Sequence, residues 1–131
     1  MTKAISSIDE ETYQKENYWG ISASIDLQGC DSVMIKTPKE IERFVIELCK
    51  EIKMKRHGDV MIDRFGDGEL EGYSFLQFIE TSSITAHFDE PESRAFIDIF
   101  SCKYYDSQVT AEFCKNFFKA DSYQMNVLLR K

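Results

Sequence analysis

The sequence predicts an α+β fold, a two-layer sandwich in which an antiparallel sheet carries two helices packed on one face. Three observations support this fold class. Segments with apolar residues at every second position recur along the chain, which is typical of strands with one buried face. Two other segments repeat apolar residues every three to four positions, which indicates amphipathic helices. Most of the strands are joined by short turns, which favours antiparallel pairing.

The composition indicates a globular chain of ordinary solubility. Its 131 residues are 43% hydrophobic and 30% charged, with a net charge of −7. We expect residues 1–17 to form a flexible N-terminal tail and residues 18–131 to form a single domain with its own core. The scattered positive charges argue against a nucleic-acid partner. The polar N-terminus and the lack of a long apolar run predict a cytoplasmic protein with no membrane partner.

The first strand and the first helix are the clearest elements. A strand is expected from Tyr18 up to the stop at residues 29–31, because apolar residues at positions 21, 23, 25 and 27 alternate with polar residues at 22, 24 and 26. Pro38 at the first helical position, with Thr37 before it and Glu40 after it, predicts a capping box. The apolar residues of the expected helix are Ile41, Phe44, Val45, Leu48, Cys49 and Ile52.

The rest of the chain predicts five more strands and a second helix. Asp106 or Ser107 is expected to cap this helix, whose apolar stripe contains Val109 and Cys114. A turn at residues 90–93 separates two of the strands. The strands are expected at residues 59–65, 73–80, 84–88, 95–102 and 123–129. The four cysteines show no metal-binding spacing, so we expect free thiols and no metal ion.

Two hairpins are expected to bring reactive side chains opposite each other. A turn centred near residue 92 places Ser82 opposite Cys102, and a turn centred between residues 80 and 81 places Ser74 opposite His87. Opposed residues in such ladders lie about 4.5–5.5 Å apart, and hydroxyl, imidazole and thiol groups together can perform covalent chemistry. Ser82 and His87 are five strand residues apart, about 16 Å at roughly 3.3 Å per residue. Either the strand bends sharply or a second subunit completes the site. We expect the second arrangement, a homodimer in which each active site is shared between two subunits.

The spacing of Ser74, Ser82, His87 and Cys102 resembles that of the prokaryotic S-adenosylmethionine decarboxylase proenzyme family. The likeness extends over nearly the whole chain, from the strand that ends Ile-Asp-Leu-Gln-Gly-Cys at residues 25–30. It implies a carboxy-lyase whose pyruvoyl cofactor is made from its own Ser82, with no pyridoxal phosphate. Such a ketone forms a Schiff base with the substrate amine and accepts the electrons released with CO2.

The resemblance also implies a role for each matching residue. Ser82 would attack the carbonyl of Thr81, so that the chain is cleaved between residues 81 and 82. Ser74 and His87 would assist this cleavage, and Cys102 would return a proton to the carbanion during turnover. Substrate binding is expected at two further residues, namely an adenine-stacking Phe65 and Glu90. The expected substrate is S-adenosylmethionine, and the expected role is polyamine biosynthesis.

Two departures from the family pattern keep alternatives open. Thr81 stands where family members usually carry glutamate, so a non-cleaving homologue that acts as a binding partner is one alternative. Phe-Asp-Glu-Pro at residues 88–91 replaces the usual Trp-Pro-Glu, so a basic amino acid such as ornithine or arginine is a second possible substrate. Asp98 is expected to make either a structural hydrogen bond or a substrate contact. Cys49 and Cys114 are expected to fill the core.

Overall fold

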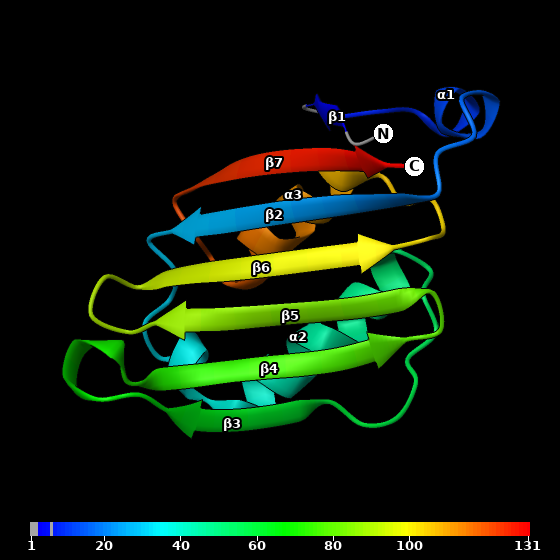
Figure 1. Cartoon of the computed structure of the whole chain (residues 1–131). Coiled ribbons are helices and arrows are strands. Elements are labelled where there is room, and N and C mark those ends of the chain that lie inside the picture. Colours follow the sequence, from blue (N-terminus) through cyan, green and yellow to red (C-terminus); the bar gives the residue numbers. More distant parts are fainter. Residues whose placement is uncertain (1–2, 6) are drawn as a thin grey trace.

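Seven strands form one sheet in the computed structural model, which describes residues 3–5 and 7–131. Their order is β1-β7-β2-β6-β5-β4-β3, and all the pairs are antiparallel (Figure 1). The strands are β1 Lys3–Ile5, β2 Gly20–Gln28, β3 Met61–Phe65, β4 Gly72–Ile79, β5 Ser82–Asp89, β6 Arg94–Ser101 and β7 Ser122–Arg130. Chain neighbours β3 to β6 are also neighbours in the sheet, as short hairpin connections require.

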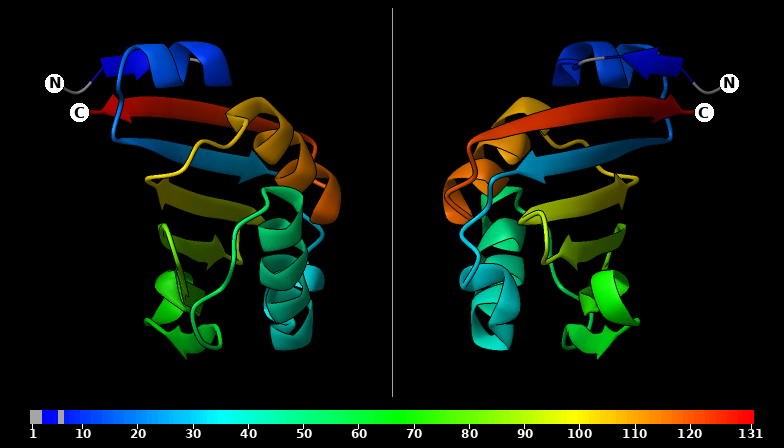
Figure 2. Two further views of the ribbon diagram at one scale, coloured as in Figure 1. Left: turned by 90° about the vertical axis from the view of Figure 1, so that its right-hand side faces the viewer. Right: turned by 90° about the vertical axis from the view of Figure 1, so that its left-hand side faces the viewer.

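Two helices, α2 Pro38–Glu51 and α3 Ser107–Phe117, pack on the same face of the sheet (Figure 2). This arrangement confirms the predicted α+β sandwich. Phe44 of α2 is fully buried, with its ring 4.7 Å from that of Phe118 and 6.2 Å from that of Phe75 in β4. These contacts join both helical segments to the sheet in one core. No helix in the described part of the chain is long and apolar enough to cross a membrane.

Of the two helix caps predicted from the sequence, only that of α3 forms. Asp106 caps α3 as predicted, because its carboxylate accepts a hydrogen bond from the Val109 N–H at 3.1 Å. Thr37, however, forms no capping bond with α2, since its hydroxyl donates to the Val33 carbonyl at 2.7 Å. The 3₁₀ helix η1 Met34–Lys36 directly before it places this carbonyl within reach.

The described part of the N-terminal segment contains a strand and a helix, in contrast to the flexible tail expected over residues 1–17. Within its described part, β1 pairs with β7, and helix α1 runs over Glu10–Lys15. Asp9 caps α1 by accepting a hydrogen bond from the Thr12 N–H at 2.7 Å. Tyr13 is buried between Tyr18 and Tyr104, which lie far apart in the chain. The sequence did not predict this contact, because only one aromatic side chain of an otherwise polar segment makes it.

The second face of the sheet, which we call the open face, is covered by neither α2 nor α3 (Figure 2). Alternation along the strands places Ser74, His87 and Asp98 on this face, while their chain neighbours point into the core. Four large apolar side chains of the same face are exposed: Met61, Phe65, Phe78 and Leu128. The open face therefore combines reactive groups with apolar surface.

Candidate active site

Ser74 and His87 form a hydrogen-bonded pair on the open face. Their strands β4 and β5 align these residues directly, as the hairpin register predicts. The Ser74 hydroxyl and His87 Nδ1 are 2.7 Å apart, and both residues are half-buried. The ring of Phe65 lies 6.5 Å from that of His87, and 55% of the Phe65 residue surface is exposed. An imidazole in such a position can carry a proton while the hydroxyl fixes its orientation.

The predicted alignment of Ser82 with Cys102 is wrong by one residue, since Ser82 aligns with Ser101. The connecting loop holds four residues, 90–93, and Asp89 pairs with Arg94 across its base. An ion pair of 2.6 Å between Arg94 Nε and the Asp89 carboxylate closes this loop. An even number of loop residues centres the turn between residues 91 and 92, which shifts every pair by one position.

Cys102 nevertheless lies beside the proposed cleavage site. It directly follows β6, and its backbone N–H donates a hydrogen bond to the carbonyl oxygen of Thr81 at 2.9 Å. This carbonyl belongs to the peptide bond that links Thr81 to Ser82. Of the four cysteines, only Cys102 is exposed. A backbone donor on this oxygen polarises the carbonyl and makes its carbon a better electrophile.

Ser82 has an unusual backbone conformation. It is the first residue of β5 and pairs with Ile79 across a tight turn that contains Thr81. Its φ angle is +153°, in a region that residues with a side chain rarely occupy. Such a conformation costs on the order of 1–3 kcal/mol and persists only where the surroundings enforce it. The residue predicted to attack therefore has a strained backbone.

The hydroxyl of Thr81 is anchored in the core by groups that the sequence analysis did not identify. It accepts a hydrogen bond from the Ser101 hydroxyl at 2.8 Å and donates to the sulfur of Met54 at 3.3 Å. Ser101 is fully buried and also accepts a hydrogen bond from the Lys103 N–H at 3.0 Å. The sequence could have indicated Ser101, because this polar residue continues the alternation of buried residues set by Ile97 and Ile99, and a buried hydroxyl needs a hydrogen-bond partner.

The predicted site residues form two clusters within one chain. Ser82 and Cys102 lie at the start of β5 and the end of β6, whereas His87 with Ser74 lies toward the other end of β5. Ser82 and His87 are five positions apart on one continuous strand, a separation of about 16 Å at roughly 3.3 Å per residue. The strand therefore keeps the two clusters apart.

Glu90 is engaged by an arginine. The Arg64 guanidinium contacts both Glu90 carboxylate oxygens, one of them at 2.9 Å, and it also contacts Glu71 at 3.0 Å. The hydrogen bonds from Arg64 lower the pKa of Glu90. The role of Glu90 in substrate binding remains a prediction, and in this conformation its charge is already compensated.

Three further residues considered in the sequence, Asp98, Cys49 and Cys114, have structural roles: one makes a hydrogen bond and two fill the core. Asp98 accepts a hydrogen bond from the Ser24 hydroxyl at 2.6 Å on the open face. Cys49 and Cys114 are buried among apolar side chains, and burial raises the pKa of Cys49 to about 11. Their thiols are therefore poor nucleophiles at neutral pH.

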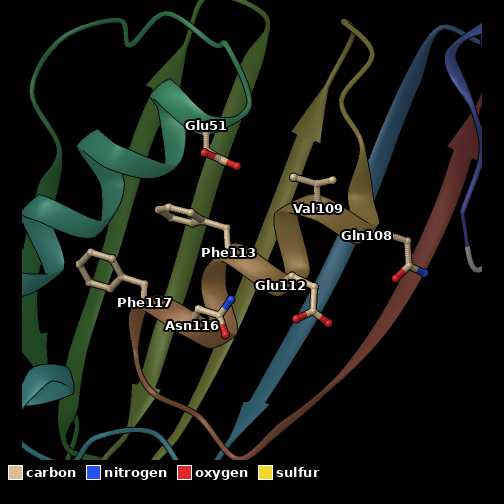
Figure 3. A pocket seen from close by; sticks show the side chains of 7 residues that line it. All are labelled: Glu51, Gln108, Val109, Glu112, Phe113, Asn116 and Phe117. Atoms are coloured by element: carbon tan, nitrogen blue, oxygen red, sulfur yellow. The ribbon is translucent and has the colours of Figure 1, made fainter.

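A groove of about 580 Å³ lies on the helical side of the molecule (Figure 3). Phe113 and Phe117 project from α3 toward α2 there, and Val109, which we expected in the core, is 47% exposed beside them. None of the predicted site residues line this groove. The chemistry suggested by the sequence therefore belongs to the sheet and its turns.

Comparison with known proteins identifies the fold and the family of the chain. The chain resembles the crystal structure of the adenosylmethionine decarboxylase from Aquifex aeolicus VF5, with a TM-score of 0.74 and 16% identity. The match covers 86% of this chain and 91% of the other, and at this identity it shows the fold. No curated protein matches the sequence significantly. The sequence model of the S-adenosylmethionine decarboxylase family matches residues 21–131, and the chain therefore belongs to that family.

Proposed function

We propose that this protein is a pyruvoyl-dependent decarboxylase that cleaves its own chain between Thr81 and Ser82 and acts on S-adenosylmethionine in polyamine biosynthesis. One observation carries this proposal: a strained serine follows a carbonyl that is hydrogen-bonded by the N–H of Cys102. The strain raises the energy of the uncleaved turn, and the N–H stabilises negative charge on the carbonyl oxygen.

The cleavage uses the atoms of the turn together with one water molecule. Ser82 Oγ bonds to the Thr81 carbonyl carbon, the C–N bond breaks, and the hydroxyl proton moves to the released nitrogen, which gives an ester. Loss of the Ser82 α-proton then breaks the bond between Cβ and Oγ and frees the Thr81 carboxylate. The resulting enamine at residue 82 adds water and releases ammonia, which leaves a pyruvoyl group at the start of residues 82–131.

In turnover, the pyruvoyl ketone supplies the electron sink that ordinary side chains lack. The chain's own residues hold the substrate and move protons. Cys102 is exposed beside residue 82, so its thiol is available to return a proton to the α-carbon after CO2 leaves. The phenyl ring of Phe65, near His87, offers a flat surface for the substrate's adenine.

Completion of the site requires a second subunit in this proposal. The 16 Å between the two clusters exceeds the reach of a side chain (about five residues at roughly 3.3 Å each). The open face carries the Ser74–His87 pair and exposed apolar side chains, including Met61 and Phe78, as expected of a surface that becomes covered. In the dimer proposed here, a two-fold axis through this face would bring the Ser82 end of one subunit to the His87 end of its partner.

Intact-mass spectrometry under denaturing conditions tests the cleavage directly. We expect two fragments, residues 1–81 and 82–131, the second of which reacts with a carbonyl-trapping reagent. Ser82→Ala should remain one chain, while Ser83→Ala, a matched control one position further along β5, should still be cleaved. A wild-type chain that stays intact and unreactive after long incubation would instead support the non-cleaving homologue.

A basic amino acid such as ornithine or arginine is the second candidate substrate. The observation in its favour is the ion pair of Arg64 with Glu90. Because of this ion pair, the Glu90 carboxylate that is expected to bind S-adenosylmethionine already has a partner. The test measures CO2 release from S-adenosylmethionine, ornithine and arginine separately, with the Ser82→Ala protein as the blank. Activity on ornithine or arginine alone would overturn S-adenosylmethionine as the substrate.

A further inference from the structure

Tyr13 links the N-terminal helix to the proposed cleavage site. It belongs to α1, which lies at the β1–β7 edge of the sheet (Figure 1) and precedes residues 21–131, the segment that matches the family. The side chain is only 3% exposed. Its ring lies 5.7 Å from that of Tyr104, which is two residues after Cys102. A buried tyrosine usually places its hydroxyl on a specific partner.

That partner is the backbone of Cys102. The Tyr13 hydroxyl donates a hydrogen bond to the Cys102 carbonyl oxygen at 3.3 Å. Burial, and to a lesser degree the nearby Cys102, raises the pKa of Tyr13, so the hydroxyl stays protonated and remains a donor at neutral pH. The N–H of the same residue 102 donates to the Thr81 carbonyl. Residue 102 is thus held on one side by Tyr13 and faces the scissile carbonyl on the other.

We propose that Tyr13 is a positioning residue for self-cleavage, which holds Cys102 so that its N–H points at the Thr81 carbonyl oxygen. This inference rests on the proposed function. When Ser82 Oγ bonds to the carbonyl carbon, the electron pair of the C=O double bond moves onto that oxygen. The Cys102 N–H then stabilises the charge until the C–N bond breaks and the proton reaches the nitrogen. A fixed donor is more effective than a mobile one because it needs no reorganisation during the reaction.

The variant Tyr13→Phe keeps the ring and removes only the hydroxyl. We expect it to slow cleavage about fivefold, as loss of one hydrogen bond in the network predicts, when followed by intact mass over time. Tyr104→Phe is the matched control, because the Tyr104 hydroxyl also ties down the N-terminal segment, donating to the Ile8 carbonyl at 2.9 Å. We expect its cleavage rate to stay within about twofold of wild type. Equal slowing in both variants would overturn the inference in favour of general packing.

A second measurement does not depend on cleavage. In chains that carry Ser82→Ala, amide hydrogen exchange at residue 102 reports whether its N–H is held. We expect Tyr13→Phe to accelerate exchange at Cys102 about fivefold without changing exchange at Val127 in β7, and Tyr104→Phe to change neither. Unchanged exchange at Cys102 would overturn the positioning role. If the wild-type chain never cleaves, the proposed function fails, while this exchange measurement still decides whether Tyr13 holds residue 102.

Discussion

At the scale of single residues, the conformation of Ser82 and the contacts of Thr81 matter most. Thr81 replaces the glutamate of the family pattern, which kept a non-cleaving homologue open as an alternative. Its hydroxyl, however, is bound to Ser101 and Met54, which fixes the turn from the core side. The residue therefore helps to hold the conformation in which Ser82 has its φ of +153°.

The strain at Ser82 predicts an unusual order of stabilities. Neither Ser82→Gly nor Ser82→Ala can form the ester, so both can be compared as intact chains. Glycine tolerates a positive φ, so we expect Ser82→Gly to be more stable than Ser82→Ala by about 1 kcal/mol, measured by urea unfolding. At position 83, in the regular part of β5, we expect the alanine variant to be more stable than the glycine variant. Equal stability of the two Ser82 variants would argue against strain.

At the scale of elements, α2 attaches the helical layer to the sheet through Phe44. This side chain is fully buried and its ring packs against four other phenylalanine rings. We expect Phe44→Ala to lower the free energy of unfolding by about 3–5 kcal/mol, measured in urea. Val109→Ala on the exposed side of α3 should change it by less than about 0.5 kcal/mol. Similar losses in both variants would contradict this assignment of the core.

The ion pair of Arg64 with Glu90 ties β3 to the turn after β5 and predicts a pH effect. The folded-state pKa of Glu90 lies below the ordinary 4.5, so the folded protein binds fewer protons there than the unfolded chain. The ion pair's contribution to the free energy of unfolding is complete when the pH is above the ordinary pKa of 4.5. It is lost as the pH falls through the lowered pKa of the folded state. The melting-temperature difference between wild type and Glu90→Gln should shrink over that range. A variant of the exposed Glu92, Glu92→Gln, serves as the control.

The elements were largely predictable, because a buried face leaves a repeating pattern in the sequence. Alternation located β2 and β4 to β7, and the spacing of Phe44 with its neighbours located α2. The relative register of β5 and β6 was missed by one residue, since it depends on how residues 90–93 close their loop. Tyr13 was missed because its hydroxyl meets Cys102 across 89 positions of sequence, and no local pattern records such a contact.

At the scale of the whole molecule, the separation of the two clusters predicts complementation between subunits. Chains with Ser82→Ala or His87→Ala should each fail to cleave. In a mixed dimer, the intact Ser82 of one chain meets the intact His87 of the other, so about one site in two is complete. Intact mass of differently tagged chains should therefore show cleavage of the His87→Ala chain only.

The control replaces the Ser82→Ala partner with a chain that carries both substitutions, which removes every His87 from the mixed dimer. No cleavage is expected there. If the first mixture also stays uncleaved although tag pull-down proves that mixed dimers form, the shared site is contradicted. Cleavage in both mixtures would show that His87 is not required.

The strand order has a consequence for the two pieces that the proposed cleavage would produce. Residues 1–81 contain β1 to β4 and residues 82–131 contain β5 to β7, and strands of the two sets are interleaved in the sheet. Four of the six strand interfaces therefore join one piece to the other. Neither piece would retain a complete sheet of its own, so after the proposed cleavage the two halves would stay interlocked without a covalent link. If the chain is cut there, it must fold before it is cut.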